Sequence, residues 1–166
     1  RQAGTTTRIS VSSGGAQANN ASYGSEITRD GSVVAITSDA TNLVSGDTNG
    51  AIDLFFRNMQ TGAMTRLMGL AGSQPNGNFV PGVFSEDGRY YSFISTASNL
   101  VANDLNGKPD AFLHDLQSNS TERVSVATGG AEANDNSRFP FVSNDGRFVV
   151  FDSVATNLVA TDNNLF

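Results

Sequence analysis

The stretch SEDGRYYSFISTASNLVANDLNGKPDAFLHDL, residues 85–116, contains the features that decide the fold. Its Asp87-Gly88 pair suits a tight hairpin turn, because glycine tolerates a positive φ. Short runs rich in aromatic and β-branched residues lie before and after this turn, and another run follows the long polar loop. Their periodicity is two rather than 3.6, and no segment of the chain shows a convincing helical stripe. The stretch therefore predicts antiparallel strands joined by tight turns and one long loop.

The same design occurs nearly three times along the 166 residues. The glycines of the Asp-Gly pairs are 57 and 58 residues apart, at Gly31, Gly88 and Gly146. An Asn-Leu-Val motif and a loop aspartate return with the same two offsets, at Asn42, Asn99 and Asn157 and at Asp47, Asp104 and Asp162. Several independent anchors share one period, so chance is a poor explanation and the chain is built from repeats.

Each repeat contains four short predicted strands. Four-stranded antiparallel units on this scale favour an all-β fold, a β-propeller with about three blades in this chain. A stack of β-hairpins or a sandwich is the structural alternative. We expect one propeller segment over residues 1–166, with a blade-completing fourth strand at 1–13, repeats at about 20–70 and about 78–127, and a partial repeat at 137–166.

The residues SEDGRYYSFIS and DAFLHDLQSNSTERVSV resemble the WD40-like, TolB-type propeller repeat. That repeat carries a Ser-x-Asp-Gly turn, a Phe ending the second strand, an Asp-aromatic third strand and a Thr-Arg-Val or Thr-Arg-Leu fourth strand. The long acidic loop departs from ordinary TolB repeats and is similar to a bacterial extracellular subset carrying NLV…DxNG…D. The resemblance covers the whole chain and implies the propeller fold, while it says little about function.

The acidic loops are the candidate metal sites. Each carries Asp, Asn and Asp at positions one, three and seven, as Asp47, Asn49 and Asp53 in one copy and Asp104, Asn106 and Asp110 in the next. This spacing resembles the first part of thrombospondin- and dockerin-type calcium loops, so calcium is the candidate cofactor, with a weak affinity of about 10⁻⁴ to 10⁻³ M. The alternative is turn chemistry without metal, in which Asp and Asn side chains bond their own backbone.

Successive loops of a meander alternate between the two ends of the sheet. The acidic loops should therefore share one face with the inter-blade connections at residues 14–20 and 129–136. We expect a non-catalytic interaction module that binds a protein, peptide or glycan through this face. The alternatives are an accessory propeller domain of a TolB-like, peptidase or lyase-type enzyme, and a purely structural repeat fragment.

Three blades are fewer than the roughly four to eight that close a propeller. An open wedge exposes apolar sheet faces, which is a liability in a monomer. We expect a homodimer that closes about six blades, in which each copy donates its first strand to the last blade of the other. The alternative is a longer chain that supplies the remaining blades.

The net charge, the absence of cysteine and the single histidine make several classes of function less favoured. The net charge of −6 disfavours nucleic acid, and no apolar run approaches the roughly 20 residues of a membrane-spanning helix. The chain has no cysteine, which fits a secreted, periplasmic or cell-surface protein. The only histidine, His114, is expected to be structural, so no nucleophilic triad is indicated and we expect no enzyme. Arginine recurs at one place in the fourth strand, which predicts ion pairs at Arg8, Arg66 and Arg123.

Overall fold

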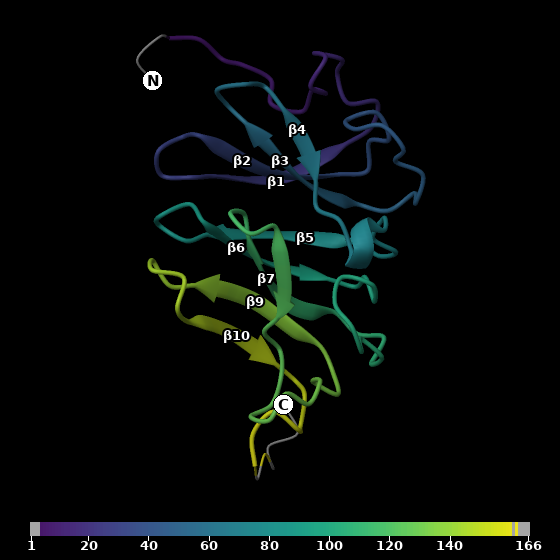
Figure 1. The fold of residues 1–166 in the computed structure, drawn as a ribbon, viewed down its shortest axis with the longest axis vertical. Coiled ribbons are helices and arrows are strands. Elements are labelled where there is room, and N and C mark those ends of the chain that lie inside the picture. The colour runs from purple at the N-terminus through teal and green to yellow at the C-terminus, as the bar shows by residue number, and fades with distance from the viewer. Residues whose placement is uncertain (1–3, 161, 163–166) are drawn as a thin grey trace.

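The computed structural model describes residues 4–160 and residue 162, and it confirms the all-β fold with four-stranded antiparallel blades (Figure 1). The first blade contains β1 (Ser22–Ile27), β2 (Val33–Ser38), β3 (Asp53–Asn58) and β4 (Met64–Arg66). The second contains β5 (Phe79–Phe84), β6 (Tyr90–Ser95), β7 (Asp110–Asp115) and β8 (Ser120–Arg123). The third blade is represented by β9 (Ser137–Val142) and β10 (Val149–Ser153). Among the described residues the helical content is one 3₁₀ turn (Leu70–Gly72), far short of what a bilayer-spanning helix requires.

The Asp-Gly sequences form the tight hairpins, and a hydroxyl two residues before each aspartate completes the turn. In the first hairpin the Thr28 hydroxyl donates to Asp30 Oδ1 at 2.7 Å, and the Ser32 N–H donates to the same oxygen at 3.0 Å. These hydrogen bonds stabilise the charged carboxylate and lower the pKa of Asp30 to about 2. Gly31 has a φ of 73°, which explains the glycine in this position. The same bonds recur around Asp87 and Asp145.

Strand β5 contains a bulge that brings it close to β6. The register between the two strands shifts between Val80 and Val83. Pro81 lies in this bulge, where its missing N–H does not interrupt the ladder. At Gly82 a Cβ atom would overlap the carbonyl oxygen of Ser92, so only glycine allows this approach of the two backbones.

The main core lies between the first two blades. Ala35, Leu54 and Phe56 of the first blade belong to the same buried cluster as Tyr91 and Phe93 of the second. The ring centroids of Phe56 and Tyr91 are 5.6 Å apart in an edge-to-face arrangement. Each fully buried aromatic side chain of this kind contributes about 1.5–3 kcal/mol by burial alone. The blades are thus held together by packed side chains across their faces, because the strands of different blades do not share a sheet.

His114 is part of this same interface, as expected for a structural residue. Its ring stacks on Phe56 with centroids 5.5 Å apart, and Nδ1 lies 3.0 Å from the Thr121 hydroxyl. Burial lowers the pKa of His114 to about 4, so the imidazole is neutral at physiological pH.

The opposite face of the first blade is covered by the N-terminal segment. Val34, Ile36 and Phe55 are buried there, with Ile9 and Ala18 packed against them. Within the described part of the predicted strand at residues 1–13, the structure has no strand and one isolated bridge, from Val11 to Gln17. A fourth strand needs a third strand beside it, so the blade-completing role of this segment stays a prediction. The last residues of the predicted partial repeat, 163–166, lie outside the described residues.

Candidate functional site

The long loops after β2 and β6 lie at the same end of the blades as the inter-blade connections, and the tight hairpins lie at the other end (Figure 1). A hydrogen bond joins each long loop to the inter-blade connection that follows its blade. Gln74 Nε2 donates to Asp47 Oδ1 at 3.0 Å, and Leu105 N donates to Glu132 Oε1 at 3.0 Å. We call this end the loop face. The alternation of loops expected from the sequence therefore places all the candidate ligand residues on it.

A buried arginine occupies the centre of the first acidic loop. Arg66 Nη1 lies 3.0 Å from Asp47 Oδ1 and 3.2 Å from Asp53 Oδ2. The Arg66 side chain is 5% exposed, and Asp53 is fully buried. Asn49 uses its amide group to donate to both carboxylate oxygens of Asp53, at 3.0 and 3.1 Å. Its own oxygen accepts the N–H of Ala51 at 3.0 Å, so this oxygen closes a turn.

The second acidic loop has the same arrangement with one more carboxylate. Arg123 Nη1 lies 3.6 Å from Asp104 Oδ1 and 3.7 Å from Asp110 Oδ2, and it also pairs with Glu132. Asn106 Nδ2 donates to Asp110 Oδ2 at 3.0 Å, as Asn49 does in the first loop. The ion pairs predicted from the repeated arginines are therefore confirmed at Arg66 and Arg123. We call these two groups the first and second arginine–carboxylate clusters.

Burial dominates the electrostatics of both clusters. It raises the pKa of Asp53 to about 6, and the Asp47 carboxylate adds to the rise although Asn49 and Arg66 oppose it. Burial also raises the pKa of Asp104 to about 6, with a further contribution from Asp110. A buried carboxylate is costly unless it is paired, so the guanidinium compensates charges that the loop sequence places in the interior.

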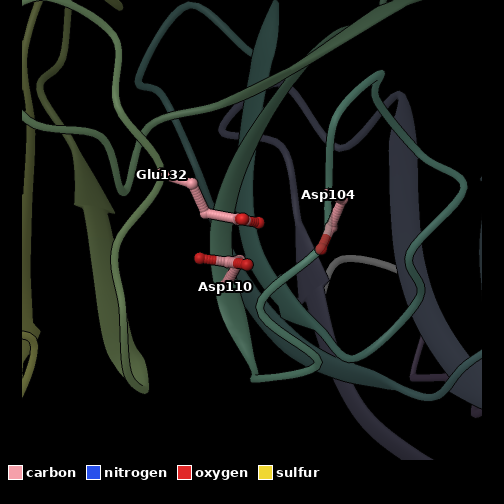
Figure 2. Close-up of side chains that lie close together, drawn as sticks. All are labelled: Asp104, Asp110 and Glu132. Atoms are coloured by element: carbon pink, nitrogen blue, oxygen red, sulfur yellow. The ribbon is translucent and has the colours of Figure 1, made fainter.

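The second cluster also brings three carboxylates within reach of a single ion. Ligand oxygens of Asp104, Asp110 and Glu132 all lie within 4.8 Å of one another. Figure 2 shows the side chains of Asp110 and Glu132 close together and Asp104 approaching from the β6–β7 loop. A cation at this place would meet the Arg123 guanidinium, which already pairs with all three groups. Calcium binding by the predicted residues stays a prediction, and it requires that the arginine move out.

A second device fixes the loops to the inter-blade connections and was not foreseen from the sequence. Asn42 Nδ2 donates to the carbonyl of Gln17 at 2.7 Å, and Asn42 Oδ1 accepts the N–H of Asn19 at 2.9 Å. Asn19 Oδ1 in turn accepts the N–H of Thr41 at 2.9 Å. The same bonds join Asn76 to the segment of Asn99 and Asn134 to that of Asn157. We call each of these units an asparagine pair.

Both devices leave a signal in the sequence. The first members of the asparagine pairs, Asn19, Asn76 and Asn134, are spaced by the same 57 and 58 residues as the Asn-Leu-Val motifs. Gln74 and Glu132 are also one period apart, and both contact an acidic loop. When polar residues of the connections and polar residues of the long loops recur with the same spacing, the two sets are expected to contact each other in every repeat.

The fold is found among solved structures, whereas no family model and no curated protein sequence matches the chain. The putative TolB from Agrobacterium tumefaciens is similar with a TM-score of 0.54 and 22% identity, over 81% of this chain and 39% of that one. The tricorn protease is similar with a TM-score of 0.50 and 12% identity, over 81% and 11%. The β-propeller domain of the Trilobed protease from Pyrococcus furiosus has a TM-score of 0.47 and 14% identity, over 80% and 34%.

These likenesses concern the fold. The chain spans 39% of the length of the first of these structures and smaller shares of the other two. Together with the blade arrangement, the likenesses to TolB and to tricorn protease establish a β-propeller segment of about three blades.

Proposed function

We propose that this β-propeller segment is a non-catalytic interaction module that binds a protein, peptide or glycan through its loop face. The observation that carries the proposal is a loop face whose backbone is tied down by ion pairs and hydrogen bonds while side chains on it are exposed. The arginine–carboxylate clusters and asparagine pairs hold its backbone in place. A surface fixed in advance loses little conformational entropy on binding, which favours recognition.

Leu105 is the best single candidate for a contact residue on this face. Its backbone N–H is bonded to Glu132, while its side chain is 84% exposed. A large apolar side chain on an anchored loop can bury its surface against a partner at small entropic cost. The loop face also exposes amide and hydroxyl side chains, such as those of Asn19 and Thr41, which suit the polar rim of a peptide or glycan site.

Acid–base catalysis through His114 is disfavoured by its packing. The imidazole is buried and neutral, and it contacts a threonine within its own sheet. A general base needs access to a substrate proton, which this packing denies. An accessory role beside an enzyme in a longer protein is the alternative reading of the same binding face.

Calcium is the second candidate role for the acidic loops, favoured by the three carboxylates of the second cluster. A bound ion would replace Arg123 as the positive partner of Asp104 and Asp110. Purified protein is heated in millimolar calcium and in chelator, with magnesium as the matched control. Our preferred reading, loops stabilised by arginine, predicts equal unfolding temperatures, and a rise specific to calcium would establish the metal role.

The binding role is tested with arrays of glycans and of peptides probed with the purified chain. The strongest hit is then titrated against wild type, Leu105→Ala and Asn144→Ala, because Asn144 lies on a tight hairpin at the opposite end. We expect Leu105→Ala to weaken binding about tenfold or more and Asn144→Ala to leave it unchanged. Equal effects of the two variants would show that Leu105 is not part of the binding site. The absence of any hit on both arrays would favour the purely structural reading.

Self-association and an exported location complete the proposal. The exposed apolar face of the third blade supports closure of the ring by a second copy. A cysteine-free, acidic propeller segment suits a secreted, periplasmic or cell-surface setting. Fractionation of the native host separates these compartments from the cytoplasm.

A further inference from the structure

The N-terminal segment folds into a hairpin that the chain uses a second time. Residues 9–18 and 124–133 each contain an isolated antiparallel bridge, Val11 to Gln17 in the first and Val126 to Glu132 in the second. Four backbone hydrogen bonds recur at equivalent positions of the two segments, including one at 2.8 Å between Ser12 N and Ala16 O and one at 2.8 Å between Ala127 N and Ala131 O. The equivalence follows the repeat, so the two hairpins are copies of one element.

The second copy shows what this hairpin binds. Arg123 at its start pairs with Asp104 and Asp110 of the acidic loop, and Glu132 at its end accepts the N–H of Leu105. The connection between β4 and β5 contributes the same two positions, where Arg66 and Gln74 hold the loop of Asp47. In both cases the arginine and the Glu or Gln of one connection together hold an acidic loop.

In the first hairpin the same two positions are occupied by Arg8 and Gln17. Arg8 Nη1 donates to Gln17 Oε1 at 2.7 Å, and both side chains are exposed. Across the described part of the chain, no carboxylate forms an ion pair with Arg8. The hairpin is anchored on the first blade, since Arg57 Nη1 donates to Val11 O and Met64 N donates to Ser13 Oγ, each at 2.8 Å. The pair is therefore preformed and open to a partner.

We propose that Arg8 and Gln17 are a docking half-site for the acidic loop of a second copy of this chain, the loop that begins at Asp162. This proposal rests on the self-association proposed above and specifies its contact. Asp162 stands one period after Asp104, and Asn164 stands one period after Asn106. The positive half-site and this negative loop are complementary in charge, as Arg123 and Asp104 are within one copy.

An apolar face beside that loop supports the same partner. Val150 of β10 is 67% exposed, whereas Ala35 and Ser92, at the equivalent positions of the complete blades, are fully buried by the blade that follows. Phe141, the cross-strand neighbour of Val150, and Phe148, two residues away, are also exposed. A following blade of the same repeat would cover this face and present the Arg8 hairpin to the Asp162 loop. The first blade of a second copy supplies both features.

The test measures the dimerisation constant of the purified chain by light scattering and sedimentation. Wild type is expected at about twice 17.4 kDa. Arg8→Glu should weaken dimerisation about 30-fold or more, because it places two carboxylates against each other in the contact. Lys108→Glu is the matched control, since it makes the same charge change at an exposed residue of another loop, and should change the constant less than about threefold. The double variant Arg8→Glu with Asp162→Arg should restore the dimer by exchanging the charges.

The outcomes separate the half-site from self-association itself. A monomeric wild type at all concentrations would overturn both. A dimer that Arg8→Glu does not weaken would overturn the half-site and leave self-association standing. Failure of the charge exchange to restore the dimer would overturn the Asp162 loop as the occupant, provided that circular dichroism shows the double variant folded.

Discussion

Arg66→Ala is the substitution whose effect follows most directly from the geometry of the clusters. Arg66 is the only positive group that pairs with Asp47 and Asp53 among the described residues, at 3.0 and 3.2 Å. Removing one partner of a buried ion pair costs about 3–5 kcal/mol, because the remaining charge is left uncompensated. Asn49 and Gln74 keep their hydrogen bonds to these carboxylates, which places the expected loss near the lower end, about 3 kcal/mol. For a chain of this length that corresponds to about 6–12 °C in unfolding temperature.

The loss should depend on pH in a specific direction. Burial already raises the pKa of Asp53 to about 6, and without the guanidinium the carboxyl would take up a proton at still higher pH. Protonation removes the uncompensated charge, so the penalty of Arg66→Ala should be about 3 kcal/mol at pH 7.5 and at most about half of that at pH 5. Urea unfolding followed by circular dichroism at both pH values measures it.

Arg147→Ala is the control for this experiment. Arg147 is 74% exposed and faces Asp145 at 3.9 Å, so its removal should produce no measurable change at either pH. A loss of stability for Arg66→Ala as small as that for Arg147→Ala would show that the buried carboxylates do not depend on Arg66. A loss that is equal at the two pH values would show that the cost comes from packing rather than from unpaired charge.

Three further outcomes follow from other features. Asn42→Ala should lower the unfolding free energy by about 2 kcal/mol, because two hydrogen-bonding groups lose their partner, whereas Asn144→Ala on an exposed turn should be neutral in the same urea titration. Gly82→Ala should cost about 3 kcal/mol by thermal unfolding, since the new Cβ collides with backbone. Raised native pKa values of about 6 at Asp53 and Asp104 add protons to the folded state between about pH 4 and 6, and the pKa of His114, lowered to about 4, opposes them with one proton fewer, so the folded state on balance binds more protons than the unfolded state. Stability should therefore fall as pH rises through that window, and a steady gain in unfolding temperature from pH 5 to pH 7 would contradict this.

Much of the blade architecture could be predicted from the sequence because each repeat carries its own local signals. The Asp-Gly turns fix where strands meet, and their period of 57 and 58 residues fixes how many blades there are. The ion pairs at Arg66 and Arg123 were foreseen for the same reason, since a charged residue repeated within a strand needs a repeated partner. The turns and the ion pairs each involve residues of a single repeat, so they recur with the period of the repeat and can be recognised from it.

The roles of the side chains in the acidic loops could not be predicted, because they depend on which way each polar group points. The spacing of Asp47, Asn49 and Asp53 fits calcium ligands and turn residues equally well. In the structure the amide group of Asn49 donates to Asp53 and its oxygen closes a turn, and only the three-dimensional arrangement distinguishes these roles from coordination. The N-terminal hairpin was expected as a strand, because its alignment with other repeats says nothing about whether a neighbouring strand is available to pair.

Whether arginine or a metal ion neutralises the acidic loops is tested most directly by a high-resolution crystal structure of the chain grown in millimolar calcium. We predict that the Arg66 guanidinium lies between Asp47 and Asp53, within hydrogen-bonding distance of both, with the Asn49 amide still bonded to Asp53. An ion surrounded by six to eight oxygens at roughly 2.3–2.6 Å, with Arg66 turned out to solvent, would contradict it.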